Sequence, residues 1–216
     1  VDSSTIDQIF THHEYDFTKI SRFHNIRNLY QNNISNGHKN LILDCGSNIG
    51  CSSIYFNIEF PCAKVVGLEP DFYNYKTAIK NCKKYKNISI MNEAIGPKSG
   101  FVKIINKNSD PNSYICSIIE NSNDSLNIKM NSINKLLKFN FDLKPFIIKI
   151  DIEGFENELF GKNLEWIEST PVIIIELHDW LFPKKANSSN FLKEIAKRNR
   201  DFVILGENII SISNKI

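Results

Sequence analysis

The sequence contains no apolar run that approaches the roughly 20 residues a membrane-spanning helix needs, and no signal peptide opens it. Its net charge of +2 is close to neutral, so nothing indicates a surface for nucleic acid or for a lipid bilayer. It also contains no internal repeat and no linker-like segment. These absences favour one globular domain over residues 1–216, with neither nucleic acid nor a membrane as a partner.

Cysteine spacing gives no indication of a metal site. The five cysteines are odd in number and lack metal-ligand spacing. Several fall on expected core faces, which favours free thiols in a reducing, cytoplasmic compartment. The sequence does not begin with Met, which suggests a trimmed chain or a domain cut from a longer protein. The cysteines are Cys45, Cys51, Cys62, Cys82 and Cys116.

What the sequence does contain is an alternation of short apolar stretches and amphipathic ones, in a chain of 216 residues that can bury a sizeable core. Strands are expected at residues 41–44, 63–69, 87–91, 146–151 and 171–178. Helices are expected at residues 49–60, 70–82, 152–160 and 188–198. A hairpin is expected over 202–205 and 209–212. Strand–helix alternation implies right-handed crossovers and a mostly parallel, doubly wound α/β sheet.

Residues 1–38 precede this alternation as a helical lead-in. Apolar residues at close to helical spacing predict a helix over 17–34 that packs beside the sheet or covers its ligand edge. The cluster from His12 to Asp16 has metal-capable side chains. Adjacent histidines usually diverge, however, so we interpret the cluster as a solvated loop.

An insertion from about residue 96 to 145 interrupts the alternation. Strands are expected at 101–105 and 127–130, with a polar loop at 106–112 and an apolar patch at 114–119 between them. An insertion of this length beside the ligand edge of a sheet often carries substrate specificity.

Residues 41–50, with the sequence Leu-Ile-Leu-Asp-Cys-Gly-Ser-Asn-Ile-Gly, predict a buried strand that passes through a tight turn into a helix. Gly46 and Gly50 allow a positive φ and let a ligand approach the backbone. The following helix presents N–H groups and the positive end of its dipole to an anion over the turn. Asp44 stands at the carboxyl end of the strand, where open α/β sheets bind ligands.

Acids recur at the ends of the expected parallel strands. Asp44, Glu69, Asp151 and either Glu176 or His178 would share one sheet edge, where their side chains can converge on one crevice. A single acid at a strand end is usually a helix N-cap. Several in register favour a binding site.

The position of Glu69 and the composition of the glycine turn indicate the kind of ligand. Glu69 lies about 20 residues beyond the turn, where an acid binds a ribose diol. The turn lacks the Gly-x-Gly-x-x-Gly pattern of a pyrophosphate site, since Ser47 and Asn48 occupy its middle. Asp44 would repel a pyrophosphate and attract an ammonium group. S-adenosylmethionine is therefore favoured over NAD as the cofactor.

The chain resembles the FkbM family of S-adenosylmethionine-dependent methyltransferases. The resemblance covers roughly residues 40 to 180. It implies a class I, Rossmann-like fold: a seven-stranded, mostly parallel sheet with helices on both faces, a C-terminal antiparallel hairpin, and the insertion between the third and fourth core strands. The blocks that carry it are Leu43-Asp-Cys-Gly-Ser-Asn-Ile-Gly50, Val66-Gly-Leu-Glu-Pro70, Asn92-Glu-Ala-Ile-Gly96, Lys149-Ile-Asp-Ile-Glu-Gly-Phe-Glu156 and Ile175-Glu-Leu-His178.

The resemblance also implies a set of cofactor-binding residues. Gly46, Asn48 and Gly50 would hold the methionine portion and Glu69 the ribose hydroxyls. Glu93 with Ala94 would hold the adenine edge. The expected set is completed by Asp44, Ser47, Pro70, Asn92 and Asp151.

Methyl transfer to an alcohol is an in-line displacement in which the enzyme aligns the partners and a base takes the alcohol's proton. The candidate catalytic residues are His178, Asp151 and Glu153. We favour His178 as the base, since its reference pKa is near 6.5. Asp151 is its rival and would otherwise hold the cofactor's ammonium. His178 as a helix cap and Glu153 as a first-turn residue are the structural alternatives. We predict no metal, although these three residues as ligands of a divalent cation are an alternative.

The acceptor is predicted from the resemblance alone. FkbM-like proteins methylate hydroxyls, so a sugar hydroxyl in a glycan or glycosylated product is expected, within a larger glycan-building polypeptide. The alternatives are a non-sugar natural product as acceptor, a nicotinamide-dependent oxidoreductase of similar fold, and a module that has lost activity.

Overall fold

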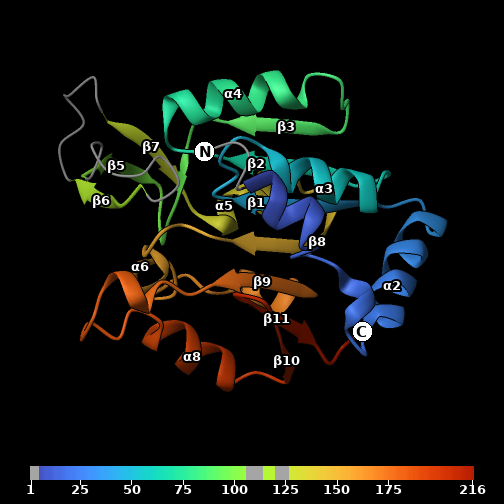
Figure 1. The fold of residues 1–216 in the computed structure, drawn as a ribbon. Helices are drawn as coiled ribbons and strands as arrows, with labels where there is room; N and C mark the ends of the chain where they lie inside the picture. The colour runs from blue at the N-terminus through green and yellow to red at the C-terminus, as the bar shows by residue number, and fades with distance from the viewer. Residues whose placement is uncertain (1–4, 106–113, 120–126) are drawn as a thin grey trace.

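The computed structural model describes residues 5–105, 114–119 and 127–216. Within these ranges a seven-stranded sheet has the order β10-β11-β9-β8-β1-β2-β3 (Figure 1). Its parallel strands are β1 (Lys39–Cys45), β2 (Lys64–Leu68), β3 (Ile88–Met91), β8 (Leu143–Ile150) and β9 (Val172–Glu176). The hairpin of β10 (Arg200–Leu205) and β11 (Asn208–Ser213) continues the sheet antiparallel to β9. The fold class predicted from the sequence is therefore confirmed.

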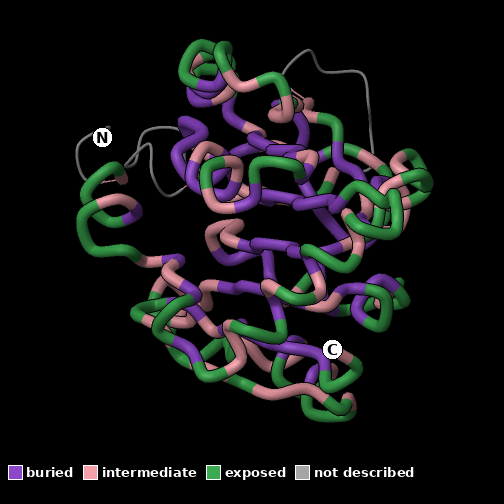
Figure 2. Tube along the Cα trace, turned by 90° about the vertical axis from the view of Figure 1, so that its right-hand side faces the viewer, coloured by how far each residue is buried: buried purple, intermediate pink, exposed green. Residues whose placement is uncertain are grey.

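The strands are apolar because both faces of the sheet are covered. Successive residues alternate between two hydrophobic clusters. Ile42 packs with helices α2 (Phe23–Ser35) and α3 (Cys51–Glu59) on one face. Leu41 and Leu43 face the other cluster, to which the later helices contribute. Figure 2 shows the sheet as the buried centre, with exposed residues on the surrounding helices and turns. The later helices are α5 (Ile133–Phe139), α6 (Glu156–Leu159), α7 (Trp166–Ser169) and α8 (Ser189–Ala196).

The predicted helix over 17–34 is interrupted in the structure. The chain first forms the short turns η1 (Asp7–Thr11) and η2 (Phe17–Lys19), and α2 begins only at Phe23. Asp16 caps η2 by accepting a hydrogen bond from the Thr18 N–H at 2.9 Å. Ile20 then adopts an extended backbone, which ends the turn.

The cluster from His12 to Asp16 is only partly a solvated loop. His12 and His13 are exposed, but Tyr15 is buried against the rings of Tyr55 and Phe56. Glu14 turns inward and accepts a hydrogen bond from the Asn208 side chain at 3.0 Å. Aromatic packing therefore anchors the segment over the carboxyl edge of the sheet.

Helix α4 (Phe72–Cys82) covers the edge strand β3 with a narrow face. Asp71 caps it by accepting from the N–H groups of Tyr73 and Asn74. Ala78 and Cys82 are buried against Ile90, as part of a small cluster. Tyr73 lies in the expected helix but is 77% exposed, because an edge strand offers no second layer to cover it.

The insertion forms a second sheet in the order β4-β7-β5-β6. The expected strands correspond to β5 (Gly100–Ile104) and β7 (Ile128–Asn131), while the apolar patch contains β6 (Cys116–Ile119) and β4 is Ala94–Ile95. The polar loop expected at 106–112 lies outside the described residues. Ala94, Val102 and Met130 pack with Phe155, which follows β8, so this sheet adjoins the edge of the main one.

The described part of the chain contains no helix long and apolar enough to cross a membrane. Its cysteines are free thiols, of which Cys45, Cys51 and Cys82 are buried and Cys62 is exposed.

Candidate active site

The glycine turn after β1 is held by hydrogen bonds within the chain. The N–H groups of Gly46 and Ser47 both donate to the Leu68 carbonyl, at 3.0 and 2.9 Å. The Asn48 N–H donates to Glu69 Oε2 at 2.8 Å. Because these donors are already bonded, the turn is poorly suited to cradle a pyrophosphate.

Gly46 is required by its neighbour across the sheet edge. Its φ is +80°, and a Cβ at this position would lie 1.7 Å from the Asp151 carbonyl oxygen. The absence of a side chain therefore lets the carboxyl ends of β1 and β8 meet, and so brings Asp151 to the turn.

Glu69 follows β2 and is 5% exposed. Each of its carboxylate oxygens accepts one backbone hydrogen bond, from Asn48 and from Asp71, both at 2.8 Å. Burial raises the pKa of Glu69 to about 8, against the opposing effect of these two N–H groups. The Asn92 side chain donates to the carbonyls of Glu69 and Pro70, which fixes the segment after β2.

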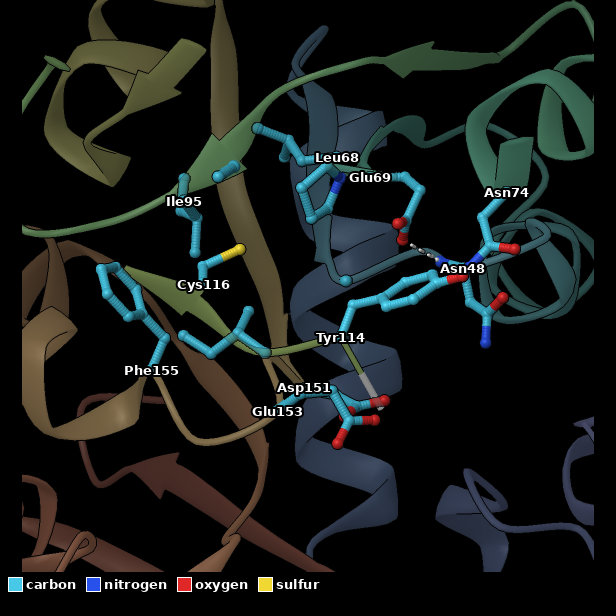
Figure 3. A pocket seen from close by; sticks show the side chains of 14 residues that line it. Asn48, Leu68, Glu69, Asn74, Ile95, Tyr114, Cys116, Asp151, Glu153 and Phe155 are labelled. Carbon is cyan, nitrogen blue, oxygen red and sulfur yellow. Dashed lines mark hydrogen bonds between the residues drawn. The ribbon is translucent and has the colours of Figure 1, made fainter. Parts of the chain in front are cut away.

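A first pocket opens beside Glu69 (Figure 3). Leu68, Ala94, Ile95, Cys116 and Phe155 form its apolar wall. Polar side chains occupy the rest of its rim, and in Figure 3 the carboxylates of Asp151 and Glu153 lie together at one end. These polar lining residues are Asn48, Glu69, Asn74, Tyr114, Asp151 and Glu153.

Lys149 connects the ends of β1 and β8 beneath the turn, and its side chain is only 2% exposed. Its Nζ donates to the Gly46 carbonyl at 2.7 Å and to Asp151 at 3.1 Å, and lies 3.5 Å from Asp44. Burial lowers the pKa of Lys149, but electrostatic interactions with Asp151, Tyr15 and Asp44 outweigh it and hold the pKa well above its ordinary value.

Asp44 is fully buried beside this lysine. Its second oxygen accepts hydrogen bonds from the hydroxyls of Ser52 and Ser53 at 2.7 and 2.5 Å. Asp44 therefore joins the end of β1 to the first turn of α3. No role was predicted for Lys149, although a charged residue inside an apolar strand is a usable signal.

His178 lies just beyond β9, 1% exposed. Its Nδ1 is hydrogen-bonded to Glu156 at 2.9 Å. Its Nε2 lies 3.4 Å from Glu176, 3.5 Å from Glu153 and 3.6 Å from Asp151. Burial lowers the pKa of His178, but the Glu156 hydrogen bond and the surrounding carboxylates outweigh it and raise the pKa to about 9. At neutral pH the ring therefore carries its proton, which argues against the predicted role of His178 as general base.

Glu153 has a strained backbone, with φ of +53° in the turn between β8 and α6. Burial and the neighbouring charge of Asp151 raise its pKa to about 8. The same two causes raise the pKa of Glu176 to about 7. The carboxyl groups of Glu153 and Glu176 are therefore partly protonated near neutral pH.

A second pocket adjoins the first at Asp151 and Glu153. Both residues line it, as they line the first pocket. Its wall also includes the hydroxyl-bearing Ser47, whose Oγ is buried without a hydrogen-bond partner among the described residues. Three further carboxylates, Glu14, Glu176 and Glu207, make this pocket strongly acidic.

The structure brings most of the predicted site residues to these pockets. The first pocket is lined by Gly46, Asn48, Glu69, Pro70, Ala94, Asp151 and Glu153, and the second adds Ser47. Neither lining includes Asp44, Gly50, Asn92, Glu93 or His178. The carboxylate of Glu93 is instead hydrogen-bonded to Lys129 and Asn131.

Residues without a predicted role complete the site. Glu156 orients His178, and Glu14 and Glu207 line the second pocket. Glu14 stood in the cluster interpreted as a solvated loop, and Glu207 in the turn of the hairpin. Tyr114 and Cys116 reach the first pocket from the insertion, in agreement with the expectation that the insertion adjoins the ligand edge.

A model of the methyltransferase FkbM domain matches residues 44–204. No curated protein matches the sequence.

Among solved structures, a putative caffeoyl-CoA O-methyltransferase from Staphylococcus aureus is 12% identical, with a TM-score of 0.49 and 99% of each chain covered. An O-methyltransferase from Bacillus cereus in complex with SAH is 13% identical, with a TM-score of 0.48 over 98% of this chain and 90% of that one. The magnesium protoporphyrin IX methyltransferase of Synechocystis PCC 6803, with bound SAM, is 11% identical, with a TM-score of 0.45 over 88% of this chain and 79% of that one.

Proposed function

Because the chain belongs to the FkbM methyltransferase domain family, we propose that it is an S-adenosylmethionine-dependent O-methyltransferase acting on a sugar hydroxyl. The observation that carries this proposal is the meeting of two pockets at Asp151 and Glu153. One pocket has an apolar wall and a buried acid, as an adenosine requires. The other is polar and open to an acceptor.

The residues of the first pocket fit this cofactor. Glu69 retains lone pairs beyond its two backbone bonds and would accept hydrogen bonds from the ribose hydroxyls. Leu68, Ala94 and Ile95 would pack against the adenine. Where the two pockets meet, the unpartnered hydroxyl of Ser47, which lines the second pocket, would bind the amino-acid portion. S-adenosylmethionine brings a methyl group on a positively charged sulfur, and the carboxylates of this edge suit a positive charge.

Three predicted residues would act indirectly. Asp44 is fully buried and would position the glycine turn through Lys149 and α3. Glu93 is bonded to Lys129 and Asn131, so we assign the adenine contact to its neighbours Ala94 and Ile95. His178 would orient the carboxylates as a charged ring.

The acidic second pocket limits the acceptor. Hydroxyl groups donate hydrogen bonds, and carboxylates only accept them. A neutral or amino-bearing sugar would therefore bind well. A phosphate close to Glu14, Glu176 and Glu207 would be repelled.

In the reaction that we propose, the acceptor hydroxyl lies against Asp151 and Glu153. Its oxygen attacks the methyl carbon while the carbon–sulfur bond breaks, and the hydroxyl proton passes to Glu153. The pKa of Glu153, about 8, lies close enough to neutrality for this transfer. The positive sulfur would lower that pKa and increase the carboxylate form. Alignment of the two partners would supply several kcal/mol of the barrier.

The test is a transfer assay with isotopically methyl-labelled S-adenosylmethionine and three sets of sugars: neutral, amino-bearing and phosphorylated. We expect an O-methyl product from the first two sets and about a hundredfold slower turnover in Glu153→Gln, the lower range for losing a general base. A methyl group on nitrogen or carbon, or preference for phosphorylated sugars, would contradict the proposal. Glu158→Gln, at an exposed position of α6, serves as the control.

A nicotinamide-dependent oxidoreductase has less support, because the N–H groups of the glycine turn are already bonded. The free thiols support our proposal that the protein works in a reducing compartment.

A further inference from the structure

The carboxyl edge of the sheet carries a second kind of site. We infer that Asp151, Glu153 and His178 bind a hard divalent cation of the Mn²⁺ or Mg²⁺ class. Each residue offers one ligand atom, and these three atoms lie within 4.8 Å of one another. The three residues come from the ends of β8 and β9, so the framework of the sheet fixes their separation.

The distances fit ligands that share one ion. Metal–ligand bonds of roughly 2.0–2.2 Å place neighbouring ligand atoms roughly 3.0–3.6 Å apart, between octahedral and tetrahedral geometry. The Nε2 of His178 lies 3.5 Å from Glu153 and 3.6 Å from Asp151. It is also 3.4 Å from Glu176, which could supply a fourth ligand. The spacing is therefore that of a coordination sphere.

The histidine is oriented as a metal ligand is. Its Nδ1 is hydrogen-bonded to Glu156 at 2.9 Å, so Nε2 points at the carboxylates. Glu156 is itself fully buried and accepts hydrogen bonds from the Asn187 side chain at 2.8 Å and the Gly154 N–H at 3.2 Å. A carboxylate that fixes the second nitrogen of a metal-binding histidine is a recurring feature of such sites.

The Nε2 atom of His178, whose side chain is only 2% exposed, faces three carboxylates at 3.4 to 3.6 Å. Nε2 is therefore aimed into the proposed ion site. An imidazole binds a metal ion in its neutral form, so the ion would displace the proton that the ring carries without it.

Once the carboxyl groups at this site are ionised, the local charge also favours a cation. Four carboxylates surround one imidazole: Asp151, Glu153, Glu156 and Glu176. Like charges at these separations repel strongly in a partly buried site. Lys149 offsets Asp151 from below, where it also contacts the Gly46 carbonyl and Asp44. A divalent ion between the carboxylates would remove the remaining repulsion.

The ligand set selects the class of ion. Carboxylate oxygens suit Mg²⁺ and Mn²⁺, and one imidazole among them is compatible with Mn²⁺. Open coordination positions would face both pockets, because Asp151 and Glu153 line both. That an acceptor oxygen takes one of these positions rests on the proposed function, whereas ion binding does not. Each carboxylate contributes one oxygen, so the other oxygen of Glu153 stays available for the acceptor's proton.

The test is a titration of the full chain with Mn²⁺, followed by electron paramagnetic resonance, without cofactor or acceptor. We expect one saturable ion per chain and hyperfine coupling to an imidazole nitrogen. Asp151→Asn and Glu153→Gln should weaken binding about tenfold or more, since even outer-shell changes typically cost 10–100-fold. The matched control is Glu158→Gln, which removes an exposed acid of α6 that lines neither pocket, and it should bind Mn²⁺ as the unaltered chain does.

Three results would overturn the inference: no saturable Mn²⁺ binding, an ion without nitrogen coupling, or a loss in Glu158→Gln as large as in Glu153→Gln. The nitrogen coupling is measured on the unaltered chain, so it does not depend on the variants folding. S-adenosylhomocysteine binding, measured in parallel, separates the two proposals. If S-adenosylhomocysteine binds and Mn²⁺ does not, the ion site is wrong and the methyltransferase proposal stands. If Mn²⁺ binds and S-adenosylhomocysteine does not, the ion site stands and the methyltransferase proposal is wrong.

Discussion

Both pockets contain carboxyl groups with raised pKa values, buried in the first pocket and partly buried in the second, but the groups are held differently. Each oxygen of Glu69, in the first pocket, accepts a backbone N–H. Glu153 and Glu176, at the second pocket, face His178 and other carboxylates. Fixed backbone donors hold an acid in one geometry, ready to recognise one ligand. A cluster of charged side chains can gain or lose protons when a ligand binds, so it is suited to proton transfer or to binding an ion.

The side chain of Lys149 contacts Gly46 and Asp151, which line both pockets. Removing this side chain should have the largest effect on the stability of the fold. Lys149→Met would leave Asp44 buried beside no cation. We expect the free energy of unfolding to fall by about 3–5 kcal/mol, as for a broken buried ion pair. Urea denaturation measures this. Lys144→Met, at an exposed position of the same strand, should change it by less than about 0.5 kcal/mol. Equal losses in the two variants would show that the buried ion pair does not matter.

A side chain at Gly46 tests whether the first pocket needs its backbone geometry. Gly46→Ala places a Cβ against the Asp151 carbonyl and keeps a positive φ. We expect a loss of about 3 kcal/mol, from strain and displaced backbone. Gly206→Ala also has a positive φ, but nothing lies within 4 Å of its Cβ, so about 1 kcal/mol is expected. Similar losses in thermal or urea unfolding would mean that contact with β8 is unimportant.

The charge cluster of the second pocket should make the free energy of unfolding depend on pH. The pKa of His178 is raised from 6.5 to about 9, so its stabilisation is full below 6.5 and is lost as pH rises through 9. Glu153 and Glu176 have pKa values raised from 4.5 to about 8 and about 7, so the folded state holds protons that the unfolded state releases. All three groups make the free energy of unfolding fall as pH rises from about 5 to 9.

Urea unfolding at pH 5, 7 and 9, with a chelator present, measures this slope. Glu153→Gln should flatten it, and Glu158→Gln, which changes an exposed acid, should not. A free energy of unfolding that rises over this range would contradict the account of the cluster.

The fold and the first pocket were largely readable from the sequence. The apolar strands, the glycine turn and Glu69 are local signals, because strand ends in a parallel sheet share one edge. The interrupted helix before α2 was not predicted, since a cap at Asp16 and an extended Ile20 end it early.

The second pocket was less predictable because it is assembled from distant segments. Glu14 and Glu207 come from opposite ends of the chain, and neither stands in a recognisable motif. The role expected of His178 rested on its reference pKa, which the hydrogen bond to Glu156 and the nearby acids change. Spacing in a sequence does not give such electrostatic surroundings.

The most direct test of the central claim is calorimetric titration of the chain with S-adenosylhomocysteine, with NAD as the comparison ligand. We expect micromolar binding of S-adenosylhomocysteine, about −8 kcal/mol, its loss in Glu69→Ala and its retention in Glu158→Ala. NAD should bind weakly or not at all, because the N–H groups of the glycine turn are already bonded. Preference for NAD, or S-adenosylhomocysteine binding unaffected by Glu69→Ala, would contradict the account.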